Sequence, residues 1–365
     1  MRILSLAYLL FMLTTTMASA QAEWNVDYNA FLDNREYKNK ENGVYPGSLL
    51  GGWLTPSVGY RFEERHALYG GAALLQEFGS DQFADQYRYV AYYQFLGKYF
   101  DLKVGAFSFT DVLGDYPGIL VSDSIFEYTP VMTGVTWQLH RPKLVVNSWL
   151  DWVGRQSDAK HEEFVVGSDL KWKPSFWYAG FQTYLRHYAA TALGDPDDHV
   201  TDAGMTYLFA GVDLSNRFVL DSLTLQVGYI IEESRVRGYV TPWIKPSGFL
   251  VQLQAEWRGL GVKNTCYAGD GQYALSDANT YGYGGSFLYW GDPYYRFSLY
   301  NRTDFILRIL QSDRVQAYFS YSLHYADHLL SSQQQFMLRV NIGNMKPGRL
   351  KARREQNQLW KSILK

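Results

Sequence analysis

Apolar and polar residues alternate with a period of two along most of this chain, and this pattern restricts the fold to β-structure. Residues 314–325 show the alternation clearly. Val315 and Phe319 fall in one register, whereas Ser320 and His324 fall in the other. Successive side chains of a strand point to opposite faces, so such a segment has one apolar and one polar face. The chain is therefore predicted to be built from strands that separate two unlike environments.

The first twenty residues have the pattern of an export signal. Arg2 is followed by an apolar stretch over residues 3–13, and Ala18-Ser19-Ala20 provides small residues for cleavage. A membrane anchor is the alternative. The apolar stretch is shorter than the ~20 residues that a spanning helix needs, and threonines at 14–16 interrupt it. We therefore expect residues 1–20 to be a cleaved signal peptide.

Sixteen segments of the chain are predicted to be strands. Most of them reach the roughly 9–11 residues that a tilted strand needs to cross a bilayer. The predicted strands are 24–33, 49–62, 65–77, 87–96, 99–109, 125–139, 143–153, 162–172, 176–187, 204–214, 222–232, 248–258, 260–268, 294–309, 314–325 and 333–342.

The connections between these segments alternate in length. Seven are short and rich in turn residues, and eight are longer, among them 34–48, 110–124, 269–293 and 326–332. Outer-membrane barrels have short periplasmic turns and longer extracellular loops. The alternation therefore predicts a transmembrane antiparallel up-and-down β-barrel of about sixteen strands, with both ends of the chain in the periplasm.

A closed barrel also assigns the two faces of each strand. In lipid only a closed sheet satisfies every backbone polar group, so the apolar register must face outward and the polar register inward. A soluble sandwich would reverse this assignment, and the export signal and the loop lengths favour the barrel. The outward set is predicted to include Val315, Phe319 and Leu323, and the inward set Gln316, Ser320 and His324.

The predicted domain organisation is simple. Residues 1–20 form the signal peptide, residues 21–344 the barrel and residues 345–365 a basic tail. The tail carries seven basic residues against one acid, Glu355. It is interpreted as a short amphipathic helix at the inner surface of the membrane, as a docking segment for a periplasmic partner, or as a frayed end.

Composition excludes several classes of protein. Aromatic residues make up 17% of the chain and charged residues 19%, against an average charged content of about 25%. The net charge of −2 gives no reason to expect nucleic-acid binding. The single cysteine, Cys266, excludes an intramolecular disulfide. The seven histidines are dispersed, so neither a metal site nor a cofactor is predicted.

At the level of architecture, the chain resembles Gram-negative outer-membrane porin-like β-barrels. The resemblance is carried by Ala18-Ser19-Ala20, the sixteen alternating strands and the rhythm of the loops. It implies an outer-membrane location and passive diffusion of small hydrophilic solutes, without a cofactor. The implied partners are outer-membrane lipid, lipopolysaccharide and the barrel-assembly machinery. The chain departs from the pattern because twenty-odd residues follow the last strand, so the trimeric state of general porins is not carried over.

Charged residues in the inward register, in segment 31–38 and in loop 110–124 are the candidates for lining or constricting a pore. An internal field of this kind orients small polar solutes. The alternative is that these charges pair across strands and only hold the wall. The candidates are Asp33, Arg35, Glu36, Lys103, Asp111, Asp115, Asp123, Arg186, Glu256, Arg296, Arg302, Asp304 and Arg339.

The loop 110–124 is the third long loop in the predicted order. In general porins the third loop folds into the lumen as a constriction, and the resemblance implies the same role here. Its acids Asp111, Asp115 and Asp123 would then favour the passage of cations. A barrel that is plugged, and that acts as an interaction partner in a secretion or surface complex, is the alternative function.

Enzymatic activity is not predicted from the sequence. Ser322 and His324 share one face of a strand, but that face points inward, whereas a lipid-cleaving site is expected to face the bilayer. No Gly-x-Ser-x-Gly motif occurs in the chain. The chain is therefore predicted not to be an enzyme, and a membrane-embedded lipid hydrolase is the less favoured alternative.

Overall fold

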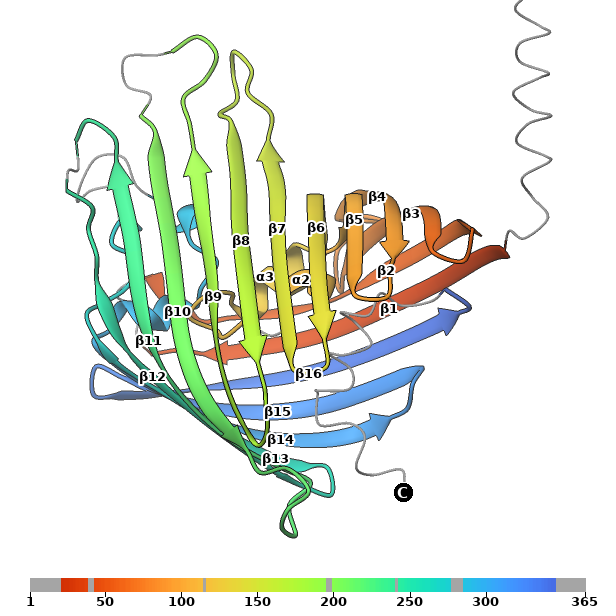
Figure 1. Cartoon of the computed structure of the whole chain (residues 1–365). Helices are drawn as coiled ribbons and strands as arrows, with labels where there is room; N and C mark the ends of the chain where they lie inside the picture. The colour runs from red at the N-terminus through yellow and green to blue at the C-terminus, as the bar shows by residue number, and fades with distance from the viewer. Residues whose placement is uncertain are drawn as a thin grey trace, which may run out of the picture.

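The computed structural model describes residues 21–38, 43–113, 116–194, 199–239, 242–276 and 285–345, and these residues form one closed β-barrel of sixteen strands (Figure 1). The predicted signal peptide and all of the basic tail except Met345 lie outside these residues. The strands are β1 (Gln21–Glu36), β2 (Gly47–Phe62), β3 (His66–Glu77), β4 (Gln86–Leu96), β5 (Phe100–Ser108), β6 (Val131–Arg141), β7 (Leu144–Gly154), β8 (Glu163–Trp172), β9 (Trp177–Tyr188), β10 (Thr201–Asp213), β11 (Ser222–Val236), β12 (Ser247–Trp257), β13 (Leu260–Gly269), β14 (Leu299–Gln311), β15 (Val315–Ala326) and β16 (Leu329–Gly343).

The barrel closes because its first and last strands pair. β1 and β16 are antiparallel from Asn25 opposite Gly343 to Glu36 opposite Ser332. Every other strand pairs with its neighbours in sequence order. No sheet edge is left unpaired, which is the condition for a sheet to cross a bilayer. Within the described part of the chain, no helix is long and apolar enough to span a membrane. The predicted sixteen-stranded antiparallel barrel is confirmed.

The alternation of short turns and long loops is also confirmed, with one exception. The connection predicted as the loop 326–332 is the two-residue turn Asp327-His328, between β15 and β16. Both residues have positive φ, 49° and 59°. Two such residues form a tight hairpin turn whose twist matches the strands it joins, so no longer loop is needed.

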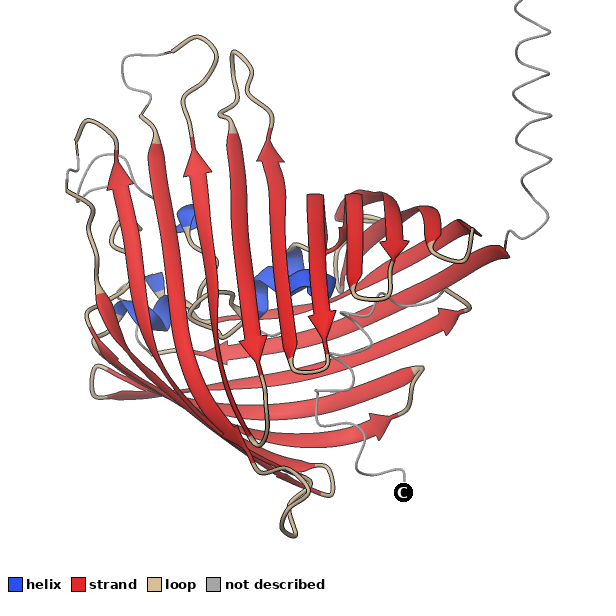
Figure 2. Ribbon diagram, in the orientation of Figure 1, coloured by secondary structure: helices blue, strands red, loops and turns tan. Residues whose placement is uncertain are grey.

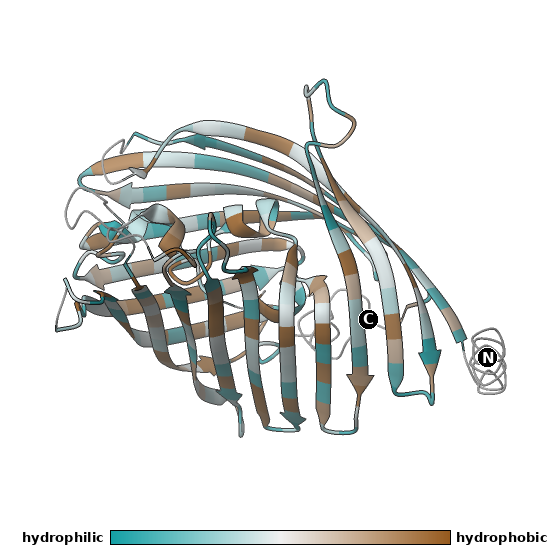
Figure 3. Cartoon of the chain, turned by 90° about the horizontal axis from the view of Figure 1, so that it is seen from above, coloured by the Kyte–Doolittle hydropathy of each residue, from teal (hydrophilic) through white to brown (hydrophobic). Residues whose placement is uncertain are grey.

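The two faces of the strands follow the predicted assignment for β15. Phe319 is 36% exposed on the outer surface, whereas Ser320 is 5% exposed and His324 is fully buried. Figure 3 shows the alternation of hydrophilic and hydrophobic residues along the strands. A girdle of exposed aromatic residues lies near the short turns, as expected at the periplasmic membrane interface. Its members are Trp24, Phe100, Trp137, Trp172, Trp177 and Trp257.

Two of the long loops fold into the barrel and carry its short helices (Figure 2). The loop between β5 and β6 contains α2 (Thr110–Leu113) and α3 (Asp123–Tyr128). The loop between β13 and β14 contains the 3₁₀ helices η3 (Ser286–Leu288) and η4 (Pro293–Arg296). We call these two segments, 109–130 and 270–298, the plug.

The plug corrects two predicted strands. The segment 125–139 was predicted as a strand, but residues 123–128 form α3 and β6 begins only at Val131. Pro130 stands at this junction, where it can neither continue a helix nor donate to a strand ladder. The segment 294–309 begins as η4, because the Asp292 side chain accepts a hydrogen bond from the Tyr294 backbone and so caps the helix start.

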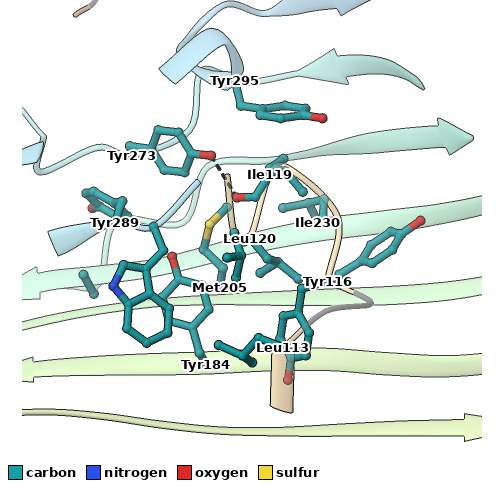
Figure 4. Close-up of a cluster of buried hydrophobic side chains, with 14 of the residues drawn as sticks. Leu113, Tyr116, Ile119, Leu120, Tyr184, Met205, Ile230, Tyr273, Tyr289 and Tyr295 are labelled. Atoms are coloured by element: carbon teal, nitrogen blue, oxygen red, sulfur yellow. Dashed lines mark hydrogen bonds between the residues drawn. The ribbon is translucent and has the colours of Figure 1, made fainter. Parts of the chain in front are cut away.

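The plug is held in the barrel by an apolar core, drawn in Figure 4. The Tyr273 hydroxyl donates to the Ile119 carbonyl over 2.8 Å and so joins the two plug segments. Trp290 stacks on Trp149 of the wall, with ring centroids 5.8 Å apart. The sequence predicts a polar inward face, and this prediction is wrong where the apolar plug packs against the wall. Large inward-facing residues of β9–β13, namely Tyr184, Met205, Tyr207, Ile230 and Tyr267, are fully or almost fully buried in this core.

The face assignment predicts unequal tolerance at two adjacent positions. Phe319→Lys places a charge in lipid near the middle of β15 and should cost about 2–4 kcal/mol of barrel stability. Ser320→Lys places the same charge in the lumen and should be tolerated much better. Folding is measured by heat-modifiable electrophoretic mobility after membrane insertion. Equal assembly of the two variants would contradict the assignment.

Candidate functional site in the lumen

The largest group of predicted site residues meets in the extracellular half of the lumen, around Arg35 at the end of β1. The Arg35 guanidinium lies 2.5 Å from Asp33 on the same strand. Its Nη2 also donates to Ser124 Oγ over 2.8 Å and lies 3.4 Å from Glu127 Oε2, both on α3. A single guanidinium therefore joins the barrel wall to the plug.

Asp33 continues this network along the wall. Its Oδ1 accepts a hydrogen bond of 2.6 Å from Gln333 of β16, and Gln333 in turn contacts His324 Nε2 over 3.1 Å. The other ring nitrogen of His324 is 2.7 Å from the Tyr300 hydroxyl. Asp33 and His324 are both fully buried. A wall of this kind is rigid, because each buried polar group has a partner.

A second guanidinium, Arg302 of β14, holds the other end of α3. Its Nε donates to Asp304 over 2.6 Å, and its terminal nitrogens lie 3.1 Å from Asp123. Asp304 also accepts from the Ser322 hydroxyl over 2.6 Å. We call the side chains around these two guanidinium groups the lumenal cluster: Asp33, Arg35, Asp123, Ser124, Glu127, Arg302 and Asp304.

Helix α3 is positioned so that its carboxylates face the arginines. The indole nitrogen of Trp53, on β2, donates to the Glu127 backbone carbonyl over 2.6 Å and ties the end of the helix to the wall. Asp123 stands in the first turn, where a carboxylate interacts favourably with the helix dipole. The helix thus bridges β1 and β14.

The two carboxylates of α3 have opposite electrostatic environments. Burial raises the pKa of Glu127 to about 8, and the charge of Asp33 adds to this effect while Arg35 opposes it. Burial also acts against ionisation of Asp123, but the charges of Arg302 and Lys263 and the hydrogen bonds from Arg302 and Gln335 together lower the pKa of Asp123. A pair with separated pKa values is typical of acid–base sites, although structural ion pairs produce it too.

The remaining predicted site residues lie elsewhere. Lys103 of β5 contacts Asp111 of α2 over 2.6 Å, which fixes the start of the plug. Three others form pairs with wall residues: Arg186 with Glu163, Glu256 with Arg308, and Arg339 with Asp27. Glu36 lies at the rim, Arg296 lies in η4 rather than in a strand, and Asp115 lies outside the described residues. A role of any of these residues in a pore stays a prediction.

Sequence reasoning missed Ser124 and Glu127. The segment 125–139 was read as a strand, which removed any reason to group Glu127 with acids of the preceding loop. The sequence does contain a signal for this short helix. An acidic residue, Asp123, is favoured in the first turn of a helix, and a proline, Pro130, commonly follows its end.

A cavity of about 420 Å³ opens at the rim beside the lumenal cluster. It lies where β1, β15 and β16 end, and Leu323, Leu330 and Lys38 are among its lining residues. Tyr37 separates it from the lumen, since its ring packs edge-on against His324, with centroids 5.3 Å apart. Among the described residues, no group of His, Cys, Asp and Glu is placed to hold a metal ion.

Solved outer-membrane proteins share this fold. OmpTdeltaL8, a loop-deletion mutant of the outer membrane protein OmpT of Vibrio cholerae, matches with a TM-score of 0.52 and 10% identity, over 89% of this chain and 100% of its own. OccK11 (OpdR) of Pseudomonas aeruginosa matches with a TM-score of 0.50 and 12% identity, over 89% of this chain and 96% of its own. At such identities the likeness establishes the fold alone. No curated protein matches the chain.

The protein is therefore an outer-membrane β-barrel, as predicted, but one expectation from the sequence is wrong. A family model described as lipid A 3'-O-deacylase-type matches residues 14–344, which include all sixteen strands of the barrel. That family is named for an enzyme, so the prediction that the chain is not an enzyme is contradicted. The chain belongs to the lipid A 3'-O-deacylase-type family.

Proposed function

We propose that this protein hydrolyses an ester-linked acyl chain of a lipid A-type glycolipid in the outer leaflet. The observation that carries the proposal is the contact of Glu127 with Arg35 in an enclosed site at the extracellular end of β1. Glu127 has a pKa near 8, so a large part of it is protonated at neutral pH and it can both accept and donate a proton. The family match supports the same class of reaction.

Hydrolysis of an ester needs a base and a group that stabilises the oxyanion. Ionised Glu127 is placed to take a proton from a water molecule as that water attacks the ester carbonyl carbon. The Arg35 guanidinium is placed to stabilise the negative charge that develops on the carbonyl oxygen. The bond from the carbonyl carbon to the ester oxygen then breaks. Glu127 returns its proton to the leaving alkoxide, which releases a fatty acid and an alcohol.

The rim cavity supports access for a lipid. It lies at the extracellular ends of β1, β15 and β16, next to the outer leaflet, and combines Leu323 and Leu330 with the charge of Lys38. An acyl chain fits the apolar part and a polar headgroup the charged part. Tyr37 then stands between this cavity and the lumenal cluster.

The proposal predicts a pH profile. The base form of Glu127 is needed for attack, so kcat/KM on a lipid A acyl ester should rise with pH and level off above about pH 8. Glu127→Gln should lower kcat by roughly 10²–10⁴-fold and remove this inflection. The measurement is release of fatty acid by the purified protein between pH 6 and pH 10.

Arg35→Gln should also lower kcat, by roughly 10²–10³-fold, because the oxyanion loses its stabilising charge. Asp27→Asn is the matched control. It removes one lumenal carboxylate charge on the same strand, at the pair with Arg339 and away from α3. It should leave activity close to wild type. Full activity of Glu127→Gln in a folded barrel would refute the assignment.

A diffusion channel is the second candidate, and one observation favours it. The Asp123 side chain is 47% exposed although it lies inside the barrel, so open space remains beside Arg302. The plug weighs against a wide pore, because its core fills much of the lumen. Two of the three acids predicted to select cations are paired, Asp111 with Lys103 and Asp123 with Arg302. Cation selectivity therefore stays a prediction.

Planar-bilayer recording separates the two candidates. The wild-type barrel should show little stable conductance, because the plug blocks the lumen. Replacement of residues 109–130 by a short Gly-Ser linker should open a large conductance, since a barrel of sixteen strands leaves an aqueous channel when nothing fills it. A stable, large conductance of the wild-type protein would support the channel instead.

A further inference from the structure

A row of outward-facing side chains crosses five neighbouring strands close to the extracellular rim. The strand register pairs Trp152 with Phe164, Phe164 with His187, His187 with Asp202, and Asp202 with Arg235. The row therefore runs from β7 to β11. It places a histidine, a carboxylate and a guanidinium beside two aromatic rings.

The row lies on the outer wall and not in the lumen. Asp202 shares its register with Leu208 of β10, and Arg235 shares its register with Val227 of β11. Leu208 and Val227 are 48% and 46% exposed on the lipid-facing surface. β9 ends at Tyr188 and β10 begins at Thr201, so the row lies one residue from the strand ends on the long-loop side. This is the level at which lipid headgroups meet the barrel.

Asp202 organises the charged part of the row. Its side chain is only 2% exposed. It contacts His187 Nδ1 over 2.7 Å, Arg235 Nε over 2.8 Å and Arg237 Nε over 3.0 Å. A buried carboxylate thus holds two guanidinium groups side by side, in fixed orientations.

The cluster keeps an excess of positive charge. Two guanidinium groups share one carboxylate, and Arg235 and Arg237 are 31% and 49% exposed. Among the described residues, no acceptor contacts the terminal nitrogens of Arg235. The nearby Glu233 is paired with Lys245 over 2.8 Å and does not neutralise the arginines. The Arg235 guanidinium lies over the ring of Trp243, 4.2 Å from its centroid, which fixes the plane of the guanidinium.

We propose that Arg235 and Arg237 bind a phosphate group of an anionic glycolipid of the outer leaflet. The planar fork of arginine matches phosphate oxygens through paired hydrogen bonds. The site lies at headgroup level, between the aromatic residues Phe164 and Trp243, and such residues favour this interface. Asp202 is the positioning residue, because it orients both guanidinium groups, Arg235 through Nε and Arg237 through Nε and Nη2, the latter over 3.3 Å.

This site is separate from the proposed hydrolysis, since the barrel wall lies between it and the lumenal cluster. Every protein in its test, including the one called wild type below, carries Glu127→Gln, so that the titration measures binding while the proposed hydrolysis is suppressed. Failure of one proposal therefore leaves the other untouched.

The test is a titration of the full-length protein in neutral detergent with bisphosphorylated lipid A, with dephosphorylated lipid A as the matched ligand. Wild type should bind the bisphosphorylated lipid more tightly. Arg235→Gln with Arg237→Gln should weaken that binding at least about tenfold, because two charge-assisted contacts are lost. Arg237→Gln alone leaves Asp202 its contacts with His187 and Arg235, and should cause a smaller loss in the same direction.

The control is a double variant that also loses two positive charges, but at the periplasmic rim of the barrel. Arg217→Gln with Arg258→Gln removes two exposed arginines near the short turns and should leave binding unchanged. Equal binding by this control and by the Arg235 and Arg237 double variant would overturn the proposal. Equal binding of the two lipids would overturn it as well. If inorganic pyrophosphate binds as tightly as the bisphosphorylated lipid, the site takes free phosphate and the lipid assignment is wrong.

Discussion

Closure of the sheet is the constraint from which the rest of the structure follows. In lipid every backbone group must be paired, and the pairing of β1 with β16 removes the last edge. Sixteen strands enclose more space than the side chains of the wall can fill. The plug fills much of that space, and large apolar residues on the inward face of the described strands pack against it. Tyr184, Tyr207 and Tyr267 are inward-facing and buried for this reason.

The plug also explains where charge gathers. Its apolar side packs against wall residues from β7 to β13, and the polar side chains of α3 face β1 and β14. There Arg35 and Arg302 each bind one end of α3. Two partly buried guanidinium groups lie near four carboxylates there, and the pKa of Glu127 is raised while that of Asp123 is lowered. The closed barrel thus provides both the enclosure and the rigid wall that a catalytic site requires.

The sequence predicted the barrel well and its contents poorly, for a physical reason. Alternation is a local property, so the strand count, the turn positions and the outward register of Phe319 could be read from it. The plug depends on contacts between distant segments, such as Tyr273 with Ile119, and no local pattern encodes these. Asp33 and Arg35 were identified because they stand in a polar motif. Glu127 was missed because its partners lie on β1, far away in sequence.

The account rests most on the plug being packed inside the barrel, and hydrogen–deuterium exchange in native membranes tests this most directly. The amides of α3 and of the segment around Trp290 should exchange more slowly than those of an exposed loop, because Trp53 and Arg35 hold α3 to the wall and Trp290 is buried against Trp149. The loop 78–85, where Phe83 is 89% exposed, provides the fast reference. Exchange of α3 as fast as that of this loop would contradict the plugged lumen, and with it the enclosed site.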